Sequence, residues 1–234
     1  TGLAMVIAVP LCMLSAIYLT EYAPSIVQQA VKPLIDLLAG IPSVVYGLWG
    51  VLTVVPLIRE CVGPWGDRHL GDLPLFSTVA NPTGYGVLAG GIVLAVMVFP
   101  IVVSVMEEVL HAIPDGLREA TLALGVTRWL MVRKVLVPRA LPGVIAAVVL
   151  GFSRALGETM AVLMVVGNIP QAPRSLFDAA YPLTALIANN YGEMMSVPLY
   201  DAALMAAGLL LLLMVLGFNL LAQLVLQRTT RRVR

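Results

Sequence analysis

The sequence predicts an all-α membrane protein, a polytopic bundle of transmembrane helices. Hydrophobic residues make up 60% of the 234 residues and charged residues only 12%, whereas soluble domains are about 45–50% apolar and about 25% charged. Several apolar stretches are long enough to cross a bilayer, which takes about 20 residues in a helix. The sequence shows no run of the alternating segments of about 10 residues that are typical of membrane β-barrels.

Five apolar stretches are predicted to be spanning helices, at about residues 2–20, 34–58, 84–106, 141–166 and 202–227. A polar connection at 21–33 follows the first, and Pro42 should kink the second because proline removes a backbone donor. With no soluble domain of any size, residues 1–234 are interpreted as a single transmembrane domain. The sequence begins inside an apolar run without a methionine, which favours a natural N-terminal helix upstream of Thr1.

Basic residues predict the orientation of these helices. The connections 21–33 and 107–140 and the C-terminal tail together hold ten Lys and Arg, whereas 59–83 and 167–201 hold three. Because Lys and Arg are enriched in cytoplasmic loops, the loop 107–140 and the tail are predicted to face the cytoplasm. The basic residues thus indicate membrane topology, and nothing in their distribution points to nucleic acid.

The loop 107–140 is predicted to fold as two short helices with a break at Gly125. Apolar residues recur at helical spacing from Leu117 to Val135, with charged residues between them. One interpretation is a solvated amphipathic connection at the membrane surface. The other is a docking element that inserts into a groove of a partner protein.

Within this loop the sequence reads Glu119-Ala120-Thr121, three residues, Gly125, nine residues, and Val135-Leu136-Val137-Pro138. This spacing resembles the EAA loop of ABC-importer permeases, which is Glu-Ala-Ala, three residues, glycine, nine residues and Ile-x-Leu-Pro. Three positions depart from that pattern by residues of similar size: Thr121, Val135 and Val137. The resemblance implies a coupling helix that contacts an ATP-hydrolysing partner through Glu119, Ala120, Thr121 and Gly125.

Two charges, Arg154 and Glu158, lie inside the apolar stretch 141–166. A charge at the centre of a spanning helix costs at least about 2.5–3.5 kcal/mol, and such residues are usually functional. In one continuous helix the two residues would share a face at spacing i, i+4 and could pair. Either the pair is structural, or it lines a translocation path in which the arginine fork binds the oxygens of an anion.

Two further stretches, 38–49 and 154–168, resemble the phosphate-transport permeases of type I ABC importers, the PstC family in particular. The residues that carry the resemblance are Gly40-Ile41-Pro42-Ser43 and Arg154-Ala155-Leu156-Gly157-Glu158-Thr159-Met160-Ala161. The resemblance implies a MetI-like permease core in the bacterial inner membrane, with Arg154 and Glu158 on the phosphate pathway. It also implies a PstA-like permease partner, a PstB-like ATPase dimer and a PstS-like external phosphate-binding protein.

Alternative functions remain open from the sequence. The chain could be a permease for another oxyanion, such as molybdate or sulfate, or a phosphate-sensing membrane scaffold that conducts nothing. The sequence contains no Walker A glycine loop, so ATP and its Mg²⁺ are expected on the partner subunit and the chain itself is not expected to be an enzyme. The two cysteines, Cys12 and Cys61, lie far apart, and we expect neither a metal site nor a cofactor.

Overall fold

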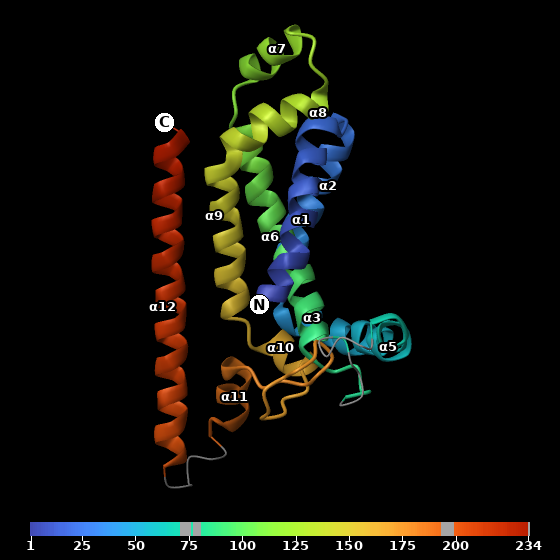
Figure 1. Cartoon of the computed structure of the whole chain (residues 1–234), viewed down its shortest axis with the longest axis vertical. Helices are drawn as coiled ribbons and strands as arrows, with labels where there is room; N and C mark the ends of the chain where they lie inside the picture. Colours follow the sequence, from blue (N-terminus) through green and yellow to red (C-terminus); the bar gives the residue numbers. More distant parts are fainter. Residues whose placement is uncertain (71–75, 77–80, 193–198, 234) are drawn as a thin grey trace. The chain divides into compact units, whose positions relative to one another are not determined.

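The computed structural model describes residues 1–70, 76, 81–192 and 199–233. Within these residues five helical segments are long and apolar enough to span a membrane, as predicted (Figure 1). They run over Gly2–Tyr22, Ser43–His69, Val87–His111, Arg128–Leu156 and Tyr200–Gln227. Arg234 and the side chains of the other basic residues in the C-terminal tail lie outside the described residues.

Two of the predicted spans have the wrong bounds. The second was expected at 34–58, but helix α2 (Ser25–Ala39) is separate and includes most of the predicted polar connection 21–33. It ends at Gly40, and α3 (Ser43–Trp49) begins after Pro42, whose extended backbone (φ −59°, ψ 140°) breaks the helix instead of kinking it. The fourth was expected at 141–166, but α9 (Val137–Leu156) ends ten residues earlier.

The chain divides into two compact units. The first comprises Thr1–Ala4, Ile41–Met97 and Arg154–Gly217, and the second comprises Met5–Gly40, Val98–Ser153 and Phe218–Arg234. Four of the long helices contribute residues to both units: α1 (Gly2–Ile17), α6 (Val87–His111), α9 and α12 (Tyr200–Val233). Each unit has its own buried core.

The first unit is built around α3 and α10 (Met160–Val165), which pack closely because Gly47 has no side chain. A Cβ atom at Gly47 would lie 2.7 Å from the sulfur of Met164 and 3.1 Å from the Cα of Ala161. After α3 the second span continues through η2 (Gly50–Val54), α4 (Val55–Leu57), η3 (Ile58–Val62) and α5 (Gly63–Leu70). The η segments are wide helical turns, and Ile58 in η3 is fully buried.

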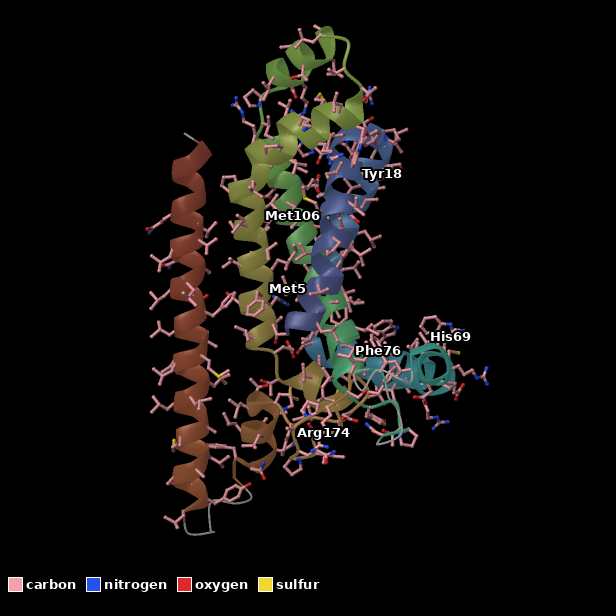
Figure 2. The ribbon with its side chains drawn as sticks, in the orientation of Figure 1. Met5, Tyr18, His69, Phe76, Met106 and Arg174 are labelled. Atoms are coloured by element: carbon pink, nitrogen blue, oxygen red, sulfur yellow. The ribbon has the colours of Figure 1, made fainter. Side chains whose placement is uncertain are left out.

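The loop after α10 closes the first unit. It leads to α11 (Leu183–Asn190), and Figure 2 shows Arg174 in this loop. The carboxylate of Asp178 is buried and accepts the backbone N–H groups of Arg174 and Ser175, both at 2.9 Å. Its backbone oxygen accepts the N–H of Val87, the first residue of α6, at 3.0 Å. The loop is therefore fastened to the N-terminus of α6.

The second unit holds α1, its wide last turn η1 (Tyr18–Tyr22), α2, and parts of α6 and α9. Its largest fully buried side chains include Met106, Leu110, Met131 and Leu136, and Met106 is labelled on α6 in Figure 2. The loop 107–140 forms α7 (Asp115–Ala123), α8 (Arg128–Met131) and the wide turn η5 (Val132–Leu136). The predicted break at Gly125 is confirmed, since its φ of +78° lies in the left-handed region that favours glycine.

Candidate functional site

Arg154 and Glu158 lie on opposite sides of a break between two helices. Arg154 is in the last turn of α9, which ends at Leu156, and α10 begins only at Met160. The prediction that both residues lie on one face of a continuous helix is therefore wrong. No ion pair joins them among the described residues. Gly157, a poor helix former, lies between the two helices, and Glu158 bonds to the backbone of the helix that follows.

Glu158 is half-buried and held at two points. Its carboxylate oxygen Oε1 accepts the backbone N–H of Ala161 in the first turn of α10, at 3.1 Å. Its backbone oxygen accepts the hydroxyl of Thr184, on α11, at 3.1 Å. Thr184 could not be identified from the sequence, because the contact joins residues 26 positions apart. Together these bonds fix the position of Glu158 relative to α10 and α11.

Glu158 also lines a pocket of about 210 Å³ inside the first unit. The other walls of the pocket are mostly apolar and come from α6, α9, α10, α11 and α12, with Thr1 and Thr184 as further polar residues. A carboxylate in such a pocket is a potential acceptor for a ligand that carries a proton.

Arg154 is exposed, and its guanidinium acts electrostatically on the phenol of Tyr46, a buried residue of α3. Tyr46 belongs to the stretch that follows Ile41-Pro42-Ser43, and no local pattern links it to Arg154. Because no carboxylate among the described residues forms an ion pair with Arg154, the guanidinium can present its paired N–H donors to an anion.

The segment after α10 turns back in a conformation that its residue types favour. Gly167 and Asn168 both have positive φ, +91° and +54°, and glycine and asparagine are the residues that tolerate this region best. The side-chain amide of Asn168 donates to the backbone oxygen of Leu163 at 2.8 Å, which closes the C-terminal end of α10. This explains the Gly-Asn pair at the end of the stretch that the sequence singled out.

The predicted partner-binding residues lie on α7 and just after it. Glu119 and Ala120 are exposed, and the hydroxyl of Thr121 donates to the backbone oxygen of Leu117 at 2.7 Å. Gly125 is exposed in the turn between α7 and α8. Large apolar side chains beside these residues are also exposed, namely Leu122, Leu124, Trp129 and Leu130, and 81% of Leu124 is accessible. An apolar surface of this kind, with a charged residue at its edge, is typical of a protein interface.

The comparisons with known proteins agree with the predicted fold. The model of the family described as binding-protein-dependent transport system inner membrane component matches residues 8–234. An inward-facing structure of the MetNI methionine ABC transporter superposes with a TM-score of 0.63, covering 97% of this chain and 88% of that chain at 21% identity. The likeness in structure confirms the predicted MetI-like permease fold.

Curated relatives are closer in sequence. The chain is 40% identical to the phosphate transport system permease protein PstC of Xylella fastidiosa over 232 residues, which cover 98% of this chain and 71% of that protein. It is 40% identical to the protein of the same name from Haemophilus influenzae, over 97% of this chain and 72% of that protein. It is 42% identical to the probable ABC transporter permease protein YqgH of Bacillus subtilis, over 94% of this chain and 66% of that protein.

The matches extend over both compact units, including the broken segment at Arg154 and Glu158 and the α7–α8 loop. The chain belongs to the family of binding-protein-dependent transport system inner membrane components, and within it to the PstC permeases.

Proposed function

We propose that this chain is the channel-forming subunit of an ATP-driven importer of inorganic phosphate, and that it works by alternating access. The observation that carries the proposal is the guanidinium of Arg154, exposed at the end of α9 in the first unit and without a carboxylate partner among the described residues. An arginine fork matches the oxygens of a phosphate ion. The relatives named as phosphate transport permeases support phosphate as the anion.

Arg154 and Glu158 have different parts in this proposal. Arg154 donates hydrogen bonds to the anion and compensates its charge as it passes through an apolar region. Glu158, which is bonded to α10 and not to Arg154, accepts the O–H of a partly protonated phosphate. A carboxylate is an acceptor only, and sulfate carries no O–H near neutral pH, so Glu158 would favour phosphate over sulfate.

The second part of the proposal concerns the partners. The exposed surface at Glu119, Ala120, Thr121 and Gly125 contacts a PstB-like ATPase dimer, which holds ATP and Mg²⁺. A PstA-like permease completes the channel, and a PstS-like protein delivers phosphate from outside. The protein lies in the bacterial inner membrane, with the basic loop 107–140 in the cytoplasm. The chain itself needs no cofactor.

Uptake by the complex, reconstituted in lipid vesicles, tests the proposal. We expect ATP-dependent uptake of labelled phosphate but not of sulfate or molybdate. In the variant Arg154→Gln uptake should fall by about 10- to 100-fold, since a hydrogen bond to a charged group contributes about 1.5–3 kcal/mol. The matched control is Arg59→Gln, an exposed arginine in the same unit whose partner is the adjacent Glu60.

The alternatives predict different results. Uptake of sulfate or molybdate in place of phosphate would identify a permease for another oxyanion. A complex that binds phosphate but moves none would identify a non-conducting sensor. Full uptake by an assembled Arg154→Gln complex would contradict the role of Arg154.

A further inference from the structure

One residue of α7, Arg118, connects this helix to two spanning segments of the second unit. Its side chain is only 14% exposed. Its Nε donates to the Oε1 of Glu21 at 3.0 Å, and its Nη2 donates to the backbone oxygen of Leu110 at 2.8 Å. Its Nη1 donates to the backbone oxygen of Ile113 and to Asp115, at 2.6 and 2.8 Å. The guanidinium therefore bonds to η1, to the end of α6 and to its own loop.

Glu21 is the more buried partner, with a side chain that is 7% exposed. It lies in η1, which is the last turn of the first span, Gly2–Tyr22. A second arginine reaches the same residue, since Nη1 of Arg128 on α8 donates to the backbone oxygen of Glu21 at 3.5 Å. Both short helices of the loop thus contact the end of the first span.

The bond to Leu110 has a separate physical basis. The last carbonyl groups of a helix lack partners within the helix, and this end carries a partial negative charge. Leu110 is in the last turn of α6, where the guanidinium supplies both a donor and a positive charge. Arg118 therefore caps α6 from a residue eight positions further along the chain.

The other side chains of α7 provide little attachment. None of the residues from Asp115 to Ala123 is buried, and the next residue, Leu124, is 81% exposed. In contrast, Met131 on α8 and Val132 and Leu136 in η5 are buried in the core of the unit. The hydrogen bonds of Arg118 thus connect α7 to the ends of the first and third spans in the second unit.

We propose that Arg118 and Glu21 form a clasp that transmits movement of α7 to the first and third spans. The proposal rests on the proposed function, in which α7 is pushed by the partner ATPase. Arg118 directly precedes Glu119, so a force applied at the contact passes to the guanidinium through one residue. Arg118 is a positioning residue in this scheme, since it touches neither the substrate nor ATP.

The first test measures the clasp itself and is independent of the transported anion. Spin labels are attached at Gly116→Cys on α7 and Ile26→Cys on α2 in the assembled complex, both at exposed positions of the second unit. Cys61 is exposed and is replaced by serine, whereas the fully buried Cys12 is retained. We expect a narrow distance distribution that broadens clearly in Arg118→Gln and in Glu21→Gln. An unchanged distribution in both variants would overturn the proposal.

The second test measures coupling as phosphate imported per ATP hydrolysed. We expect this ratio to fall at least fivefold in Arg118→Gln and in Glu21→Gln while ATP hydrolysis by the complex continues. The double variant should be no worse than the poorer single variant, because residues that act as a unit are not additive. A ratio equal to wild type, or losses that multiply, would contradict the clasp.

Two controls accompany these measurements. The first is Asp115→Asn. Asp115 pairs with the same guanidinium, but its side chain is 87% accessible, so the variant should leave the ratio of phosphate imported to ATP hydrolysed near its wild-type value. If Arg118→Gln fails to assemble, Arg118→Lys retains the charge with fewer donors and is measured in its place. A wild-type complex that imports no phosphate refutes the proposed function, while the spin-label distances still test the clasp.

Discussion

The chain contains two arginine–glutamate combinations with opposite relations between sequence and structure. Arg154 and Glu158 are four residues apart in the first unit, yet no ion pair joins them, because α9 ends between them. Arg118 and Glu21 are 97 residues apart in the second unit and form a largely buried ion pair at 3.0 Å. Proximity in sequence is thus a poor guide to pairing where a helix is interrupted.

The difference in pairing also indicates different roles for the two arginines, one structural and one in binding an anion. An arginine such as Arg118, which is only 14% exposed and makes four hydrogen bonds to neighbouring groups, holds elements together. An exposed arginine such as Arg154 holds nothing in place by an ion pair and can bind a mobile anion. The pairing state of each arginine, and not its burial cost alone, indicates which role it has.

The largest expected effect is on the free energy of unfolding, and it differs between Glu21 and Glu158. Glu21→Ala should lower the free energy of unfolding by about 3 kcal/mol, since it removes the largely buried carboxylate of the pair and leaves Arg118 only its exposed partner Asp115. Glu158→Ala should cost only about 0.5–2 kcal/mol, the usual effect of losing one capping bond at a helix start. Unfolding in mixed micelles with increasing SDS, followed by tryptophan fluorescence, measures both. Equal losses of unfolding free energy in the two variants would contradict this prediction.

A second prediction concerns the backbone of the α7–α8 turn. Gly125→Ala should destabilise the turn by about 1–2 kcal/mol, because a Cβ atom disfavours the positive φ at this position. The ATPase subunit should then be lost from the complex more easily during purification in detergent. Gly116→Ala is the matched control, since it lies in α7 with no atom within 4 Å of the added Cβ and with no positive φ. Equal retention of the ATPase subunit in both variants would contradict the prediction.

The smallest expected effect concerns the support of Glu158. Thr184→Val removes the hydroxyl that bonds to the backbone oxygen of Glu158 and should raise the KM for phosphate about fivefold, which corresponds to about 1 kcal/mol. Thr184→Ser retains the hydroxyl and should behave as wild type. Thr159→Val is a second control, because its hydroxyl makes only a local contact to Gly157 at 3.5 Å. If the KM is the same in Thr184→Val and in wild type, the hydrogen bond from Thr184 does not help to position Glu158 for phosphate.

Much of the fold could be predicted from the sequence because a membrane imposes strong local rules. Five long apolar segments, and two short helices separated at Gly125, follow from hydropathy, spacing and the freedom of glycine to adopt positive φ. The resemblance in the α7–α8 loop and around Arg154 also led to the correct family. These features depend on residues that are close together in the chain.

The errors have a common cause. The apolar run 141–166 is long enough for one span, but one helix ends before Gly157 and another begins where the N–H of Ala161 donates to the carboxylate of Glu158. Hydropathy does not register such a break, because the residues on both sides are equally apolar. The hydrogen bonds of Thr184 and Glu21 join distant parts of the sequence, and no local pattern could have indicated them.

The wide helical turns have a consequence for how the length of this chain can vary. Among the described residues there are four of them: η1, η2, η3 and η5. Each accommodates one residue more than an ordinary α-helical turn. Deleting a single residue there would restore the regular helical turn and leave the residues beyond it on the faces that they now occupy. In an ordinary turn the same deletion would rotate everything beyond it by about 100°, given 3.6 residues per turn. One codon can therefore be lost at these sites without reorienting the rest of a span.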